Sequence, residues 1–472
     1  MERQDVLRAI QLAGLPVPTD ADFEITGADP VLASPHRLSE GAAVARLLTG
    51  LAANQMWETK TGRRQHLRVD HRHAAAALTS FAHVQFLDRD RTPPVDVRRN
   101  LRFTRIVATA GGRHIQLHGS FHDGPQILDE LGLGEEATAE DIDAAVARRD
   151  AFELQDAFIQ RGICGGVVMS PAEWAGHPQA AALRGRPLVS ITRIGAADPQ
   201  PLPDGDRPAS GVRVLDLTRV LAGPTCAKTL AEHGADVLHI TAAHLGSTGP
   251  FDVETGIGKR QAEVDLDRAE GMEAMLDLVR GADVFSQGFR LGTLARRGLS
   301  PERLAELRPG IVYVSENCYG SVGPWSTRPG WEQLAQAATG MSWTEGMADN
   351  SGAPRLAPAA VNDYSTGYLA AYGAMVALAR RAVEGGSWHV QTSLSQTAMW
   401  YQSLGTVERP DQSQLGDLSA FMAEMDTPHY GHIRYLTPAL SMSETPPGWD
   451  LPPAPNGSHQ PEWALRAGGR PG

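Results

Sequence analysis

An aspartate at the start of an apolar helical stretch is well placed to do chemistry in this sequence. Asp363 follows the extended segment 357–361 and precedes small residues, among them Ser365 and Gly367, which leave room beside it. The free amides and the positive end of a helix stabilise a carboxylate at such a position. Two roles fit this residue: capping of the helix, which is the common use of aspartate at such a position, or catalysis.

The composition is that of a globular chain with more than one domain. Its 472 residues exceed one ordinary domain, and 42% of them are hydrophobic. A formal charge of -12 argues against nucleic acid as a partner, because phosphate binding needs a basic surface. The three cysteines lie far apart and predict neither disulfides nor a metal site. No apolar run approaches the ~20 residues of a membrane span, and the first residues lack an apolar signal region. We therefore expect a cytoplasmic protein with no membrane partner.

The order of patterns divides the chain into segments. A stretch rich in Pro and Asp at 201–210 predicts a linker between residues 1–200 and 211–405. In 211–405 strands alternate with helices, which predicts an α/β fold with a Rossmann-like parallel sheet and helices on its faces. Ligands of such sheets bind at the carboxyl ends of the strands. Residues 406–472, with a proline-rich end, predict an extended arm.

Two distant stretches of the chain resemble each other at a constant offset. Gly50 corresponds to Gly373 and Gly62 to Gly385, and both stretches predict a long helix, a glycine turn, a strand and a second helix. At the same offset Glu40 corresponds to Asp363, so Glu40 is interpreted as the remnant of a second, degenerate site. The alternative is that two similar helix–turn–strand–helix units occur independently.

Ten blocks in residues 211–405 follow one another in a specific order. They include 211–224 (GVRVLDLTRVLAGP), 230–237 (LAEHGADV), 258–260 (GKR), 288–292 (GFRLG) and 336–340 (QAATG). In content and order they resemble the family III (CaiB/BaiF-type) CoA-transferases. The resemblance implies an acyl-CoA:carboxylate CoA-transferase that uses coenzyme A as substrate and has no permanently bound cofactor. Its partners would be an acyl-CoA and a small carboxylic acid.

The resemblance also implies roles for individual residues. Asp363 corresponds to the family's covalent nucleophile, which attacks the acyl-CoA thioester to give an aspartyl anhydride and then an aspartyl-CoA thioester. Glu332 matches an acidic position near the acyl group, or is a helix-start carboxylate. The turn formed by Val220, Leu221 and Ala222 is implied to flank the thioester.

Contacts to coenzyme A are implied by a further group of positions. Lys259 and Arg296 would meet its phosphates, and Phe289 would lie along the adenine in the same loop as Arg290. The same residues also fit ordinary surface charges and a core phenylalanine. Segment 240–246 lacks the charged residues that usually follow the family's second strand, which leaves one phosphate contact in doubt.

Alternatives remain within and outside this family. The family's racemases place a His–Asp pair where this chain has Trp331 and Glu332, which favours transfer over proton exchange at the α-carbon. An α-methylacyl-CoA racemase or other isomerase is one alternative, and a catalytically silent CoA-binding protein is another. Residues 1–200 resemble a partial second copy that carries the family's small α+β domain in permuted order. Family chains interlock as dimers, so a homodimer is expected.

Overall fold

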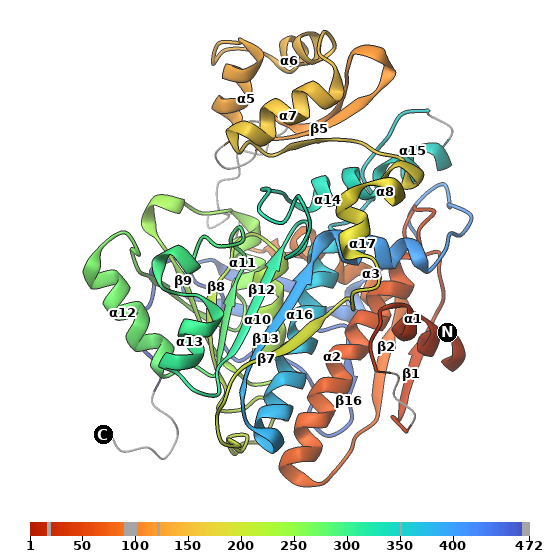
Figure 1. Ribbon diagram of the computed structural model, residues 1–472. Coiled ribbons are helices and arrows are strands. Elements are labelled where there is room, and N and C mark those ends of the chain that lie inside the picture. Colours follow the sequence, from red (N-terminus) through yellow and green to blue (C-terminus); the bar gives the residue numbers. More distant parts are fainter. Residues whose placement is uncertain (17–19, 89–101, 120–122, 350–351, 465–472) are drawn as a thin grey trace.

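A seven-stranded sheet forms the centre of the molecule (Figure 1). The computed structural model describes residues 1–16, 20–88, 102–119, 123–349 and 352–464. In sheet order the strands are β10 (Lys259–Glu263), β9 (Asp236–Thr241), β8 (Arg213–Leu217), β11 (Val284–Gln287), β12 (Val312–Asn317), β13 (Ser387–Ser393) and β7 (Ser190–Gly195). Neighbouring strands are parallel except β7, which pairs antiparallel with β13. The first six follow the order of a Rossmann-like sheet, so the predicted α/β fold is confirmed.

Alternate residues of the central strands bury their side chains in two different cores. Val214 of β8 lies in a core shared with α10 (Ala222–Glu232) and α16 (Val361–Glu384). Leu215 points to the other face, against α12 (Ala269–Arg280) and α13 (Pro301–Leu307). Because both faces are covered, β8 carries consecutive apolar residues, such as Val214 and Leu215, rather than strictly alternating ones.

Two helices of equal length pack against each other beside the sheet. They are α2 (Leu38–Thr61) and α16, and the offset between their first residues equals the offset between their last residues. The strand and helix that follow α2 are β2 (Leu67–Asp70) and α3 (His71–Ala77), and α17 (Leu394–Ser403) starts at the same offset after the start of α3. The predicted repeat of helix, turn, strand and helix is therefore confirmed at the level of the elements.

Close packing of α10 on α16 depends on Gly367. A Cβ added there would collide with the carbonyl oxygen of Ala222 and would lie 2.6 Å from Cβ of Thr225. We expect Gly367→Ala to lower the free energy of unfolding by about 1–3 kcal/mol, because the two helices must separate to admit the methyl group. Urea unfolding measures this loss. Gly176→Ala is the matched control, since a Cβ at this helical glycine meets nothing within 4 Å; equal stabilities of the two variants would contradict the prediction.

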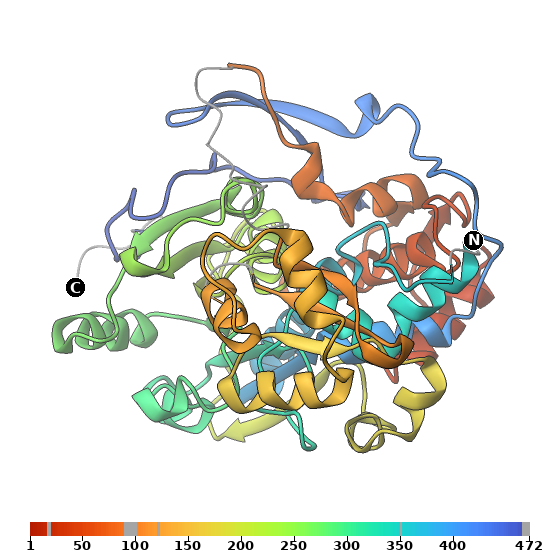
Figure 2. The same cartoon turned by 90° about the horizontal axis from the view of Figure 1, so that it is seen from above.

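A small α+β unit lies above the carboxyl ends of the central strands (Figures 1 and 2). Its antiparallel sheet has the order β4-β5-β6. The unit consists of β4 (Thr104–Ala108), β5 (His114–His118), α5 (Gly124–Leu131), α6 (Ala139–Val146), α7 (Ala151–Arg161) and β6 (Gly165–Val167). The helices α8 (Pro171–Gly176) and α9 (Pro178–Leu183) then lead to β7, which carries the chain back into the large sheet. This unit corresponds to the predicted smaller α+β domain, and it comes before the large sheet in the chain.

The chain ends pack on the large sheet unit. At the N-terminal end, α1 (Arg3–Leu12) and β1 (Phe23–Thr26) share the core of α2 and α16, and β1 pairs with β2.

The remaining elements are β3 (Gln85–Phe86), α11 (Pro250–Gly256), α14 (Glu332–Thr339), α15 (Met341–Ala348), β14 (Met422–Thr427), β15 (Gly431–Leu436) and β16 (Ser441–Met442). Residues 465–472 of the predicted arm lie outside the described part. None of the helices in that part combines the length and hydropathy that a bilayer crossing requires.

Candidate active site

Asp363 lies in the first turn of α16 and is buried, with 9% of its surface exposed. The helix begins at Val361, and its N-cap is Ala360, which makes no capping bond through its side chain. The interpretation of Asp363 as the helix cap is therefore wrong. Asp363 instead stands inside the first turn of the helix.

Glu332, the first residue of α14, accepts hydrogen bonds from the free backbone amides at the start of α16. Its Oε2 accepts the amide of Asp363 at 2.8 Å, and its Oε1 accepts the amide and the side-chain nitrogen of Asn362, both at 3.2 Å. The side chain of Gln336 donates a further bond of 2.6 Å to Oε1. Glu332 is itself 4% exposed. It therefore fixes the position of Asp363 relative to α14.

Burial and mutual repulsion govern the charge of these acids. Burial raises the pKa of Glu332 to about 7, against the hydrogen bonds from Gln336 and the amides of Asn362 and Asp363. The pKa of Asp363 is raised well above its ordinary value, first by burial and then by Glu332 and Glu316. The expectation that helix amides keep Asp363 ionised is therefore wrong for this structure, because Glu332 takes the amide of Asp363.

The loop after β8 approaches the same helix start under backbone strain. Val220 has φ +70°, and it is the one non-glycine residue with positive φ among the described residues. A β-branched residue rarely adopts this conformation, which costs on the order of 1–3 kcal/mol and often marks a functional loop. Leu221 and Ala222 follow and begin α10, and both are buried. The carbonyl of Ala222 lies against Gly367, one turn beyond Asp363.

Lys259 stands beneath this loop, and its charge is already compensated. Its ammonium group donates to Asp216 at 2.9 Å and to the carbonyl of Pro224 at 2.8 Å, and only 2% of the residue is exposed. Burial acts to raise the pKa of Asp216, but Lys259 and His239 outweigh it and hold that pKa below its usual range. Lys259 thus joins the end of β8 to the first turn of α10. Its predicted contact with a CoA phosphate stays a prediction.

The other residues predicted to bind coenzyme A lie after β11. Phe289 is half-buried, packs against the core beneath α12 and lines a cavity at the strand ends. Arg290 is exposed and donates to the carbonyl of Gly162 in the small unit at 3.2 Å. Arg296 is exposed as well. Lys259 on β10 does not neighbour these three residues in the sheet, because β9 and β8 lie between β10 and β11.

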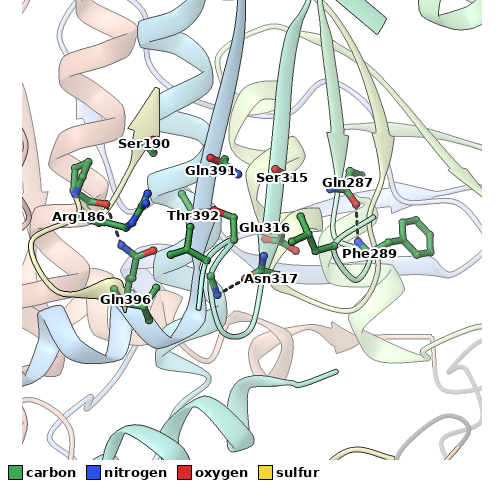
Figure 3. Close-up of a pocket in the computed structure, with 16 residues that line it drawn as sticks. Arg186, Ser190, Gln287, Phe289, Ser315, Glu316, Asn317, Gln391, Thr392 and Gln396 are labelled. Carbon is green, nitrogen blue, oxygen red and sulfur yellow. Dashed lines mark hydrogen bonds between the residues drawn. The ribbon is translucent and has the colours of Figure 1, made fainter. Parts of the chain in front are cut away.

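Glu316, which the sequence argument did not single out, lies between the loop after β8 and the loop after β11. It is 9% exposed at the end of β12 (Figure 3). A Cβ on Gly223 or on Gly288 would lie 2.8 Å from its Oε1, so the carboxyl group lies close to both glycines. Burial raises the pKa of Glu316 to about 8, the amide of Gly223 opposes this, and Asp216 adds to it. The available signal was an acidic residue near the end of a strand that begins with three apolar residues.

The pKa of Glu316 predicts a pH effect on stability. Its carboxyl titrates near pH 8 when folded, against an ordinary value of 4.5, so between these values the folded chain binds more protons. The contribution of this carboxyl group to the free energy of unfolding is therefore fully present below about pH 4.5 and is lost as the pH rises through about 8. The Glu316→Gln side chain stays neutral, so this variant should gain on the wild type by up to ~1.4 kcal/mol per pH unit.

Urea unfolding of both proteins across this pH range measures the difference in stability. Glu306→Gln is the control, because Glu306 is an exposed glutamate on α13. Its stability should follow that of the wild type at every pH. Parallel pH profiles for Glu316→Gln and the wild type would contradict the raised pKa.

The counterpart of this site at the start of α2 is arranged in the same way but is neutralised. Asp29 accepts the amides of Ser39 and Glu40 at 3.2 and 2.7 Å, as Glu332 accepts those of Asn362 and Asp363. Glu40, however, is paired with Arg37 at 3.1 Å. Burial raises the pKa of Glu40, while Arg37 lowers it. The repeat therefore preserves the geometry of the helix start, but the acid in α2 has a cation beside it.

Known proteins are similar to this chain in sequence. Residues 209–417 match the family described as CoA-transferase family III. An acyl-CoA transferase of Gibberella moniliformis is 35% identical over 318 residues, which cover 62% of this chain and 55% of the relative. The acetyl-coenzyme A transferase nodX of Hypoxylon pulicicidum is 30% identical over 384 residues, which cover 75% of this chain and 63% of the relative. The solved structure of Rv3272 from M. tuberculosis is 32% identical, with a TM-score of 0.39, over 42% of this chain and 56% of that one.

The chain spans 55% and 63% of the length of the two curated relatives. The matched segment contains the seven-stranded sheet except β7, the strained loop, Glu332 and Asp363. The family resemblance inferred from the ordered blocks is thereby confirmed. The segment 209–417, which holds six strands of the large sheet, Glu332 and Asp363, is the part of this chain that matches CoA-transferase family III.

Proposed function

We propose that the protein is an acyl-CoA:carboxylate CoA-transferase in which Asp363 is the nucleophile. One observation carries the proposal: within the family segment, Glu332 holds a buried carboxyl group at the start of a helix that packs through Gly367 on Ala222, close after the strained Val220. A carboxylate is a weak nucleophile in water and becomes effective when it is desolvated and held beside the thioester. Relatives of this chain are named acyl-CoA and acetyl-coenzyme A transferases.

The reaction proceeds through two kinds of intermediate on Asp363. The carboxylate attacks the thioester carbonyl carbon, the C–S bond breaks, and the CoA thiolate leaves an acyl-aspartyl anhydride. The thiolate then attacks the carboxyl carbon of Asp363, which releases the donor acid and forms an aspartyl-CoA thioester. The acceptor carboxylate attacks this thioester and frees the thiolate again. Attack of the thiolate on the acceptor's carbonyl carbon completes transfer and restores Asp363.

The residues around Asp363 have distinct tasks in this scheme. Glu332 holds the helix start in place through all steps. Burial excludes water, which would hydrolyse the anhydride and the thioester. The loop from Val220 to Ala222 flanks the thioester, and Phe289, Arg290 and Arg296 with Lys259 are the proposed contacts of coenzyme A. Exposed Arg290 and Arg296 supply the positive charge that phosphates require.

Trapping of the intermediates tests the proposal. The full chain is incubated with acetyl-CoA or succinyl-CoA and then with hydroxylamine, which converts an activated carboxyl group into a hydroxamate. We expect a hydroxamate on the peptide that contains Asp363, found by mass spectrometry, and none when the thioester is omitted. A protein that binds these thioesters but never acquires the modification would contradict the proposal and favour a silent CoA-binding protein.

A second candidate is an α-methylacyl-CoA racemase. The observation in its favour is the pKa of Glu332, about 7, beside the raised pKa of Asp363. Two neighbouring buried carboxyl groups whose pKa values are both raised are suited to moving a proton. Incorporation of deuterium at the α-carbon of a 2-methylacyl-CoA, without any acceptor acid, would select this activity over transfer.

We also propose that the protein works as a cytoplasmic homodimer and that residues 1–200 are a partial second copy of the family unit. The matching bounds of α2 and α16 support the second statement. Light scattering tests the first: a fully active, stable monomer would exclude the dimer.

A further inference from the structure

Gln336 on α14 joins two parts of the site through the two ends of its side-chain amide. Its Nε2 donates to Oε1 of Glu332 at 2.6 Å, and its Oε1 accepts the backbone amide of Ala357 at 2.8 Å. Gln336 stands four residues after Glu332 on the same helix, so the two side chains share one face. Ala357 lies in the segment that leads into α16. One buried side chain, 1% exposed, therefore connects Glu332 with the chain that enters the helix of Asp363.

N–H donors from α14 and α16 converge on the carboxyl group of Glu332. Gln336 makes the shortest of these bonds, and the two from Asn362 to the same oxygen are longer, at 3.2 Å each. The other oxygen, Oε2, accepts the amide of Asp363 at 2.8 Å. Such donors favour the ionised carboxylate and determine which of its oxygens points to Asp363. Because Gln336 carries no charge, it orients Glu332 without neutralising it.

The corresponding acid of the repeat, at the start of α2, has a different donor. Asp29 accepts the hydroxyl group of Ser39, which belongs to the helix start itself. The next residue, Glu40, is paired with Arg37. An uncharged amide that reaches the acid from a separate helix is therefore a feature of the copy that we propose to be active.

The two bonds of Gln336 restrict which side chains can replace it. Methionine has a similar size but makes neither bond. A glutamate at this position accepts the amide of Ala357, but in its ionised form it places a second negative charge beside Glu332. In its protonated form the same glutamate donates to Glu332 as the amide does. The substitutions Gln336→Met and Gln336→Glu therefore probe the donated bond in two different ways.

We propose that Gln336 is a positioning residue for the transfer: it holds the carboxylate of Glu332 in the orientation that fixes the amide of Asp363 while groups are exchanged on Asp363. The inference rests on the proposed function and adds to it a residue that acts through Glu332.

Labelling of Asp363 in variants of the full chain tests the inference. The rate of hydroxamate formation is measured against the concentration of acetyl-CoA or succinyl-CoA, which gives a maximal rate and a half-saturating concentration. We expect Gln336→Met to lower the maximal rate at least about tenfold, the effect of one lost hydrogen bond to a charged group, with the half-saturating concentration within about threefold of the wild type. The thioester should bind nearly as well, because Gln336 acts on the position of Asp363.

Gln402→Met is the matched control. Gln402 donates to the carbonyl of Thr339 at 2.8 Å, so it bonds to the far end of the same helix and not to Glu332. Its maximal rate should stay within about twofold of the wild type, because the two bonds are independent.

The pH profile of Gln336→Glu separates orientation of Glu332 from a merely structural role. At about pH 6 the two neighbouring carboxyl groups share a proton, which replaces the donated amide hydrogen, so the maximal rate should lie within about threefold of the wild type. At about pH 9 both groups are ionised and repel each other, and the rate should be at least about tenfold below the wild type. Gln336→Met cannot donate at any pH and should show no such recovery.

Urea unfolding measures the same contact without any transfer. The added carboxyl group of Gln336→Glu titrates at a higher pH in the folded chain than in the unfolded one, so the stability that its proton provides is lost as the pH rises. Relative to the wild type, the unfolding equilibrium constant of this variant should increase between about pH 6 and pH 9, by up to about tenfold per pH unit. Gln402→Met should follow the wild type throughout.

Three results would overturn the inference while the proposed transfer stands. They are an undiminished labelling rate in Gln336→Met, a loss in Gln402→Met as large as that in Gln336→Met, and pH profiles of Gln336→Glu that run parallel to those of the wild type. A wild type that binds the thioester but acquires no hydroxamate would instead reject the proposed transfer, and the positioning role with it.

Discussion

Replacing Asp363 with alanine is expected to abolish CoA transfer, with a fall in kcat of roughly a thousand-fold or more. Loss of a covalent nucleophile removes the route through the anhydride altogether, and effects of this size are typical of such residues. Asp363→Asn should be equally inactive, because the amide keeps the size of the side chain but cannot attack the thioester. Transfer from acetyl-CoA or succinyl-CoA to an acid panel measures the loss, together with hydroxamate formation.

The repeat supplies a matched control for this substitution. Glu40 occupies the position in α2 that Asp363 occupies in α16, and Asp29 holds its helix start as Glu332 does. Glu40→Ala removes a carboxyl group already neutralised by Arg37. We expect its transfer rate to stay within about twofold of the wild type, an upper limit set by the modest energy of such a half-exposed pair. Equal rates in Asp363→Ala and the wild type, or a large loss in Glu40→Ala, would reject the assignment.

Folding of the Asp363 variants is not expected to suffer. The pKa of Asp363 is raised in the folded chain by burial and by two neighbouring acids. Its ionised form therefore opposes folding at neutral pH, so a neutral asparagine should leave the free energy of unfolding unchanged or higher. A loss of activity together with retained stability would identify a chemical role rather than a structural one.

Arg46→Leu should give the largest loss of stability among the substitutions considered. Arg46 on α2 pairs with Glu232 on α10, and the two side chains are 1% and 3% exposed. Its guanidinium also lies 4.7 Å from the ring centroid of Tyr368. Removing it leaves Glu232 buried without this partner, which costs about 3–5 kcal/mol. Leucine is the natural substitute, because Leu369 is the residue at the corresponding position of α16.

A double-mutant cycle shows whether the stability lost in Arg46→Leu comes from the unpaired charge of Glu232. We expect Arg46→Leu/Glu232→Leu to recover most of the stability, because an apolar pair needs no partner in this core. Arg303→Leu is the control: its pair with Glu306 is exposed, so the loss should stay below about 1 kcal/mol. Urea unfolding measures all of these proteins. If Arg46→Leu and Arg46→Leu/Glu232→Leu lose the same free energy of unfolding, the loss comes from packing and not from the unpaired charge.

The sequence by itself determined the class of fold and indicated the candidate aspartate. The predicted strands 212–217 and 311–315 begin within one residue of β8 and β12, because a strand covered on both faces carries consecutive apolar residues in its middle. The constant offset between α2 and α16 was also present in the glycines and helix patterns. Ordered motifs indicated the resemblance to CoA-transferase family III before any contact was known.

Two strands of the large sheet were not predicted from the sequence. β10, Lys259–Glu263, is polar along most of its length and was predicted only as a charged motif. β7 belongs to the N-terminal part of the chain and reaches the sheet as an antiparallel edge. An edge strand gains its hydrogen bonds from a neighbour far away in sequence, and nothing in its own residues names that neighbour.

The tertiary structure decided which charges meet. Lys259 has Asp216 as its partner 43 residues away, so a lysine that suited a phosphate by its type is already compensated in the structure. Asp363 is not a helix cap, because Glu332 takes its amide from another helix. Glu316 gains its raised pKa from burial and from an acid on another strand of the sheet. Local periodicity predicts elements, but the charge state of a buried side chain depends on desolvation and on partners that long-range packing brings together.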